Sequence, residues 1–156
     1  MLIQRIECNL ASPSSTRLSL QEIREGRAGL NGHRRSLLRK VPNTGDFSNF
    51  QLKSINYNDL AYLTAATGDE FALIEAKREY ILFHGSTGNC VFSPEMLEMF
   101  ASGKDKLLAH THPGEEEPVA SPEDVEFLRL IEQKTSVVIS GRTGRYIEYK
   151  SEPFAI

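Results

Sequence analysis

The stretch Leu107–Asp124, LLAHTHPGEEEPVASPED, constrains the fold more than any other part of the 156-residue chain. An apolar run leads into His110-Thr111-His112, and residues i and i+2 of a strand project from the same face. Ser121-Pro122-Glu123-Asp124 then has the residues of a helix start, with a cap residue, an early proline and acids in the first turn. The segment predicts a strand, a loop and an amphipathic helix. His110, His112 and Asp124 would be three ligands of an open zinc site.

Each half of this motif is also common in proteins without a metal. Ser-Pro-Glu-Asp by itself is most simply a helix start, and a lone histidine on a strand is more often packed than ligating. The prediction of a metal site depends on the conjunction. Two histidines on one face, followed within one loop by an acid at a helix start, seldom occur together by accident.

Length and composition indicate one folded domain. The chain contains 40% hydrophobic and 25% charged residues, as ordinary globular proteins do. No apolar run approaches the roughly 20 residues of a membrane helix, and the N-terminus lacks a secretory pattern. Cys8 and Cys90 form no local motif and are compatible with a reducing compartment or with one disulfide. We therefore expect a cytoplasmic protein without a membrane partner, with delivery as an effector as the alternative.

The charge divides the chain near residue 45. Residues 1–45 carry eight basic and three acidic residues, a net charge of +5, whereas the remainder has a net charge of −8. We predict a basic, Gly-rich N-terminal arm over residues 1–45 and a compact catalytic domain over 46–156. The arm either packs on the acidic domain or binds an acidic partner. Nucleic-acid binding is disfavoured because residues 1–45 contain no aromatic side chain for base stacking.

Turn and periodicity signals predict the remaining elements. Helices are expected from Ser19 to Glu25, from Arg34 to Lys40, from Asn58 to Thr67 with Asn58 as cap and Gly68 as terminator, from Ser93 to Ala101, and over 123–132. Strands are expected at 70–75 and 79–84 as a hairpin, at 90–92, 107–112 and 135–139, and at 145–149. This order predicts a mixed α/β fold, a mixed β-sheet flanked by helices.

The residues His-Thr-His-Pro at 110–113 and Ser-Pro-Glu-Asp at 121–124 resemble the signature of the JAMM (JAB1/MPN) zinc metalloproteases. The resemblance covers about residues 55–140 and implies a JAB/MPN-like layout, related to that of the cytidine deaminases. It also implies a glutamate upstream, and Glu70 stands at the matching place after the predicted helix and Gly68. One departure is that eight residues separate His112 from Ser121, where the family usually has seven. The extra residue falls in the Gly114–Pro118 loop.

The resemblance implies a zinc metallopeptidase that cleaves a peptide or isopeptide bond. His110, His112 and Asp124 would hold the zinc, and a water molecule would complete its coordination. Glu70 would be the general base, and Ser121 would hydrogen-bond the water or the developing oxyanion. The other acids of the hairpin, Glu75 and Glu79, are weaker candidates because they flank its turn.

Other functions stay open beside this one. The chain is alternatively a non-catalytic JAB/MPN-like binding module or a JAB-type toxin or effector domain. A zinc deaminase is excluded because such enzymes need a Pro-Cys-x-x-Cys element, and neither Cys8 nor Cys90 has a cysteine partner at that spacing. The expected partner is a protein or peptide substrate, with ubiquitin-like proteins among the candidates. The sequence does not indicate the oligomeric state.

Overall fold

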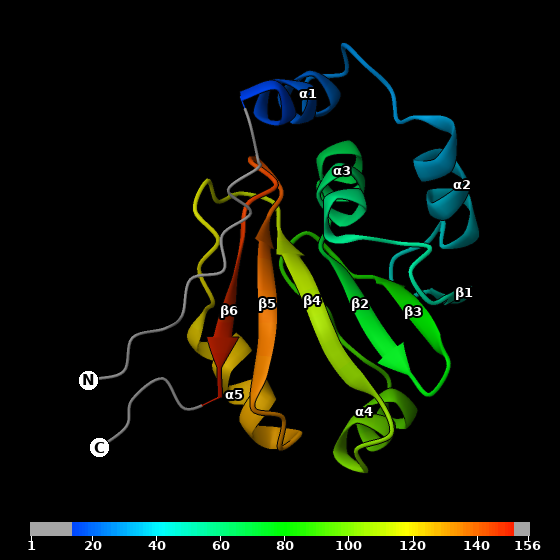
Figure 1. The fold of residues 1–156 in the computed structure, drawn as a ribbon, viewed down its shortest axis with the longest axis vertical. Coiled ribbons are helices and arrows are strands. Elements are labelled where there is room, and N and C mark those ends of the chain that lie inside the picture. The colour runs from blue at the N-terminus through cyan, green and yellow to red at the C-terminus, as the bar shows by residue number, and fades with distance from the viewer. Residues whose placement is uncertain (1–13, 152–156) are drawn as a thin grey trace.

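One six-stranded mixed sheet organises the molecule, with the strand order β1-β3-β2-β4-β5-β6 (Figure 1). The structure is a computed structural model and describes residues 14–151. Neighbouring strands are antiparallel except β4 and β5, which are parallel. This arrangement confirms the predicted mixed α/β class. The strands are β1 (Phe47–Gln51), β2 (Phe71–Ala76), β3 (Glu79–His84), β4 (Lys106–His112), β5 (Thr135–Ser140) and β6 (Tyr146–Lys150).

Helices cover both faces of the sheet (Figure 1). One face carries α3 (Tyr57–Thr67), and α1 (Ser14–Arg24) and α2 (Gly32–Lys40) pack against that helix. The other face carries α4 (Pro94–Ala101) and α5 (Pro122–Leu130). The predicted hairpin is confirmed as β2–β3, and the predicted helix after Ser93 is confirmed as α4.

Strand alternation divides the core into two layers. In β2, Phe71 and Leu73 belong to the cluster beneath α3, whereas Ala72 and Ile74 belong to the cluster beneath α4 and α5. All four side chains are buried because helices cover both faces of the strand.

The basic N-terminal segment contributes to the same core. Leu20 of α1, Leu37 of α2 and the following Val41 are buried in the cluster that also contains α3 and the sheet. Its surface also meets the acidic part of the chain, since an Arg17 guanidinium nitrogen lies 3.6 Å from a carboxylate oxygen of Glu116. Residues 14–45 therefore pack on the rest of the fold, and the boundary at residue 45 stays a prediction. Cys8 lies outside the described residues.

Two predicted helix starts are wrong by a few residues. The cap of α3 is Asn56, not Asn58, because Asn56 and Asp59 form a reciprocal capping box in which each side chain accepts from the other's backbone N–H. Ser19, where the first helix was expected to begin, lies inside α1, which begins at Ser14. The C-terminal prediction for α3 is confirmed, since Gly68 has the left-handed φ of 78°.

Two further segments differ from the sequence-based expectation. The predicted strand at 90–92 is irregular, and no strand pairing in the described structure includes it. Strand β1 was not predicted because Phe47-Ser-Asn-Phe-Gln lacks the apolar alternation of a half-buried strand; its pairing with β3 at the sheet edge creates it. Within residues 14–151, no helix is long and apolar enough to cross a membrane.

The residue between the two histidines fixes three elements to one another. The Thr111 hydroxyl accepts from the Phe71 backbone N–H at 2.9 Å and lies 2.5 Å from the Thr64 hydroxyl of α3. Beside it, Gly141 comes so close to α3 and β4 that an added Cβ would lie 2.6 Å from the Thr64 methyl group and 3.2 Å from the His112 carbonyl oxygen. Only glycine allows the β5–β6 turn to approach this closely.

We expect Thr111→Val to lower the free energy of unfolding by about 1–3 kcal/mol, because it leaves the buried Phe71 N–H without an acceptor. Chemical denaturation measures this loss. The matched control is Thr135→Val on β5, where the side chain is half-buried. Equal effects of the two substitutions would show that the Thr111 hydroxyl does not hold these elements together.

Candidate metal centre

Strand β4 presents both histidines to the face that α5 covers. Its pairing with β2 shifts register between Leu73↔Ala109 and Ile74↔Leu107, so Leu108 is an extra, bulged residue. Beyond the bulge, His110 and His112 project from the same face, and both are more than 90% buried. The predicted side-by-side placement of the two imidazoles is present.

The start of helix α5 positions the third side chain, that of Asp124. The Ser121 hydroxyl accepts from the Asp124 backbone N–H at 3.1 Å, and Asp124 Oδ2 accepts from the Ser121 N–H at 2.9 Å. This capping box fixes the Asp124 side chain at the helix N-terminus, where a carboxylate is favoured. The same contacts leave both carboxylate oxygens within reach of β4.

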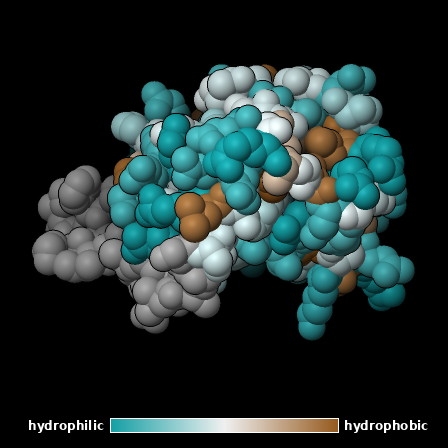
Figure 2. All heavy atoms as spheres, turned by 90° about the horizontal axis from the view of Figure 1, so that it is seen from above, coloured by the Kyte–Doolittle hydropathy of each residue, from teal (hydrophilic) through white to brown (hydrophobic). Residues whose placement is uncertain are grey.

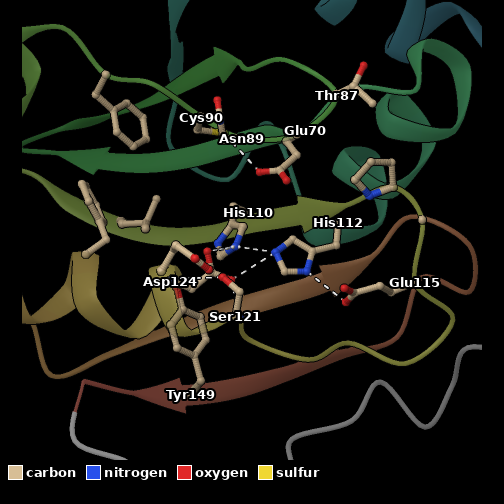
Figure 3. Close-up of a pocket in the computed structure, with 17 residues that line it drawn as sticks. Glu70, Thr87, Asn89, Cys90, His110, His112, Glu115, Ser121, Asp124 and Tyr149 are labelled. Atoms are coloured by element: carbon tan, nitrogen blue, oxygen red, sulfur yellow. Dashed lines mark hydrogen bonds and ion pairs between the residues drawn. The ribbon is translucent and has the colours of Figure 1, made fainter.

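Three potential ligand atoms converge between β4 and α5 (Figure 3). His110 Nε2 and His112 Nε2 are 3.2 Å apart, and they lie 3.2 Å and 3.1 Å from Asp124 Oδ1 and Oδ2, respectively. For tetrahedral zinc with bonds of about 2.0–2.1 Å, neighbouring ligand atoms lie about 3.3 Å apart. The residues therefore fit a metal ion in both donor chemistry and spacing, and the cluster could hold one.

Without a metal, charge pairing stabilises the cluster. Burial lowers the pKa of His112, but hydrogen bonds with Asp124 and Glu115 outweigh it and raise the pKa to about 9. Burial raises the pKa of Asp124, but hydrogen bonds with His110 and His112 hold it well below its usual range. His112 is thus an imidazolium paired with a carboxylate, so a metal ion must displace its proton.

Glu70 reaches the same cavity from the residue before β2. Its backbone N–H donates to the Ser86 carbonyl at 2.8 Å, and its carbonyl accepts from Gly85 N–H at 2.8 Å. The side chain is 8% exposed, and the Cys90 thiol approaches Glu70 Oε1 at 3.9 Å. Burial raises the pKa of Glu70, while the nearby His110 and His112 partly lower it. Glu70 is a carboxylate beside the ligand cluster and not a member of it.

Glu115, in the loop after β4, contacts one of the potential ligands directly. Glu115 Oε1 lies 3.1 Å from Nδ1 of His112, on the opposite side of the ring from the ligand atom. Such an outer carboxylate orients a metal-ligating imidazole and fixes which nitrogen faces the metal. The contact between Glu115 and His112 could be expected from the sequence, because Glu115 follows His112 by only three residues.

Tyr149 is a site residue that sequence reasoning missed. Its ring reaches from β6 toward Asp124 (Figure 3) and lies nearly perpendicular to that of His110, with 6.0 Å between centroids. The Tyr149 hydroxyl and His110 Nδ1 are both buried without a hydrogen-bond partner in the described structure. The neighbouring Ser136 hydroxyl donates to the Leu107 carbonyl. Burial raises the pKa of Tyr149, so the phenol stays protonated.

These side chains surround one cavity of about 760 Å³. Part of its wall is apolar, with Phe92, Leu107 and Phe127. Its charged lining is acidic, and no lysine or arginine of residues 14–151 lines it. The cavity brings together all five side chains that the sequence predicted for the site: Glu70, His110, His112, Ser121 and Asp124.

We expect metal binding to release the proton of His112. Because its pKa is about 9 in the metal-free protein, the ring is charged at pH 7 and must become neutral to ligate. The apparent zinc affinity therefore rises with pH, about tenfold per pH unit for this proton, until the pH approaches 9. Calorimetry at pH 7 in two buffers of different ionisation enthalpy measures the release.

Glu115→Gln is the informative variant for this linkage. It removes the carboxylate at His112 Nδ1, so the pKa of His112 falls and the pH range over which zinc binding releases this proton moves downward. Binding heats that are identical in the two buffers for the unmodified chain would contradict the expectation.

Comparisons of the chain with protein-family models, with curated proteins and with solved structures found no match. The interpretation of the centre therefore depends on its donor atoms, their spacing and the burial of the neighbouring acid. These are properties of the chain itself: two imidazole nitrogens and a carboxylate oxygen within 4.8 Å of one another.

Proposed function

We propose that this chain is a zinc-dependent metallopeptidase that hydrolyses a peptide or isopeptide bond, with Glu70 as general base. The observation that carries the proposal is the combination of two features in one cavity. Three ligand atoms lie at the spacing of a tetrahedral site, and a buried carboxylate that is not one of them stands beside them. A closed structural zinc site has no use for such an acid, whereas a hydrolytic one needs it.

The donor set supports zinc over the common alternatives. Calcium and magnesium prefer all-oxygen coordination, and the cluster offers two imidazole nitrogens with a single carboxylate. Three protein ligands with a fourth position free is the pattern of catalytic zinc. A zinc ion held there would supply Lewis-acid chemistry, lowering the pKa of a water molecule to about 7 and polarising the scissile carbonyl.

The protein side chains then divide the proton transfers. Glu70 takes a proton from the water as its oxygen attacks the carbonyl carbon, and returns that proton to the amine as the C–N bond breaks. The raised pKa of Glu70 supports this role, because a carboxylate with a pKa nearer neutrality returns the proton more readily. The Ser121 hydroxyl uses its oxygen as an acceptor for Asp124 N–H, which leaves its own proton for the oxyanion.

The resemblance to the JAMM metalloproteases belongs to this proposal. The motif residues come from a strand end and the start of the next helix, and the upstream glutamate comes from the start of a neighbouring strand. A JAB/MPN-like layout and membership of that family are proposed on these residues. The extra residue between His112 and Ser121 lies in a loop whose Glu115 and Glu116 carbonyls accept from Ser140 and Thr143, so the loop is anchored despite its length.

The proposed substrate is a protein or peptide, with an isopeptide bond to a ubiquitin-like protein as one form. The acidic lining of the cavity favours a substrate that brings a positive charge near the scissile bond. The apolar wall with Phe92 and Phe127 gives room for a hydrophobic side chain beside it.

Glu70→Gln is expected to lower kcat/KM by about 10²–10⁴-fold, because the amide cannot accept the proton of the attacking water. The zinc content should not change, since Glu70 is not a ligand. Amine release is measured on isopeptide-linked ubiquitin-like conjugates, linear peptides and peptidoglycan stem peptides, each with and without chelator. Metal is measured on the same samples.

Two further variants sharpen this test. Asp124→Ala should lose both metal and activity, whereas Glu126→Gln changes an exposed acid of the same helix that does not line the cavity and should keep both. If the unmodified chain binds zinc but Glu70→Gln and Asp124→Ala leave its function intact, the peptidase proposal fails. The site would then belong to a non-catalytic binding module.

A further inference from the structure

A second cavity, which shares no lining residue with that of the metal centre, is lined by three arginines. It has a volume of about 450 Å³ and lies where α1 meets the β5–β6 turn (Figure 1). Arg17 and Arg24 are seven residues apart on α1, with Gln21 between them, so the three share one helix face. Figure 2 looks onto this end of the molecule, where hydrophilic residues predominate. The lining residues are Arg17, Gln21, Arg24, Glu25, Glu116 and Arg142.

Two of the arginines that line this cavity each have one buried guanidinium nitrogen without a partner. Nη1 of Arg24 and Nε of Arg142 have no hydrogen-bond acceptor in the described structure. Only three other buried side-chain polar atoms of residues 14–151 share this condition, so two of the five belong to residues that line one small cavity. Because buried donors are nearly always satisfied, this convergence points to an acceptor that the protein does not provide.

The acids in the lining form no ion pair with Arg24 or Arg142 in the described structure. The Glu25 carboxylate is taken by Arg27, which donates to it at 2.9 and 2.7 Å, and by the Gln21 amide at 3.0 Å. Glu116 faces Arg17 at 3.6 Å. Burial and the positive charge of Arg142 lower the pKa of Arg24 more than the carboxylates of Glu25 and Glu116 raise it.

Hydrogen bonds fix the backbone of the β5–β6 turn, which carries Arg142. The Ser140 hydroxyl accepts from the Arg142 backbone N–H at 3.1 Å and donates to the Glu115 carbonyl at 2.6 Å. Thr143 also donates to the adjacent carbonyl of Glu116. The part of the cavity wall that the turn forms is therefore held by hydrogen bonds.

We propose that this cavity binds a phosphate group carried by a small molecule. The planar fork of arginine matches the oxygens of phosphate, and a phosphate dianion would pair with the two guanidinium groups that form no ion pair in the described structure. The volume exceeds what a lone phosphate fills, so the cavity also takes part of the group that carries it. This binding site does not depend on the proposed peptidase activity.

The test measures the affinity of the full chain for inorganic phosphate and for glycerol 3-phosphate by calorimetry at constant ionic strength. We expect binding of both, with Arg24→Gln and Arg142→Gln each weakening it about ten- to hundredfold, the loss of a charge-assisted hydrogen bond. We expect tighter binding of the ester, and equal binding would show that the cavity takes free phosphate and would overturn the organic phosphate as ligand. Arg142→Lys keeps the charge but loses the fork, and should also bind more weakly.

Two control variants show whether the phosphate binds in this cavity. Arg39→Gln removes the same charge from an exposed position on α2 and should bind as the unmodified chain does. Asp124→Ala removes a ligand of the metal centre and should also leave phosphate binding unchanged. No binding by the unmodified chain, equal weakening by Arg39→Gln, or loss in Asp124→Ala would each overturn the proposal.

Discussion

The alternation of β4 is the constraint on which the rest of the structure depends. Thr111 points to the α3 face and bonds the backbone of β2 and a side chain of α3, while His110 and His112 point to the α5 face. The contact that fixes the strand is therefore separate from the atoms available for chemistry. The Thr111 hydroxyl holds the backbone of Phe71. Because Glu70 precedes Phe71, this bond also fixes Glu70 relative to the histidines. A one-residue slip of β4 would exchange the two faces and destroy both the anchor and the ligand cluster.

Local signals made much of this predictable from sequence. Ser121 and Asp124 form the capping box that their spacing suggests, and Gly68 adopts the left-handed conformation expected of a helix end. The histidine spacing predicted the shared face correctly because a strand has a period of two and the bulge at Leu108 lies before both residues. Each of these features depends on a few consecutive residues, so one sequence suffices to predict it.

The parts that sequence did not predict depend on distant contacts. Strand β1 exists because β3 offers an edge, and nothing in its own pattern requires it. Tyr149 reaches the site from β6, which lies two strands away from the histidine strand β4. The alternating pattern of the residues around Tyr149 does not indicate a contact with His110. Asn56 was overlooked in favour of Asn58 because both are good caps, and only the reciprocal bond with Asp59 distinguishes them. Local propensity favours a type of residue at a given position, such as asparagine at a helix start. The tertiary structure decides which of two such residues takes that position.

The loop between the histidine strand and α5 connects the metal centre with the arginine cavity. Its consecutive acids have different partners: Glu115 meets His112, Glu116 meets Arg17 of α1, and Glu117 meets Arg145. The three neighbouring side chains therefore have three different partners, and the length of the loop decides which acid faces the histidine. The basic helix α1 therefore neutralises an acidic loop that also orients a metal ligand. An anion that competes with Glu116 for Arg17 would act on the same loop, within one residue of the carboxylate on His112.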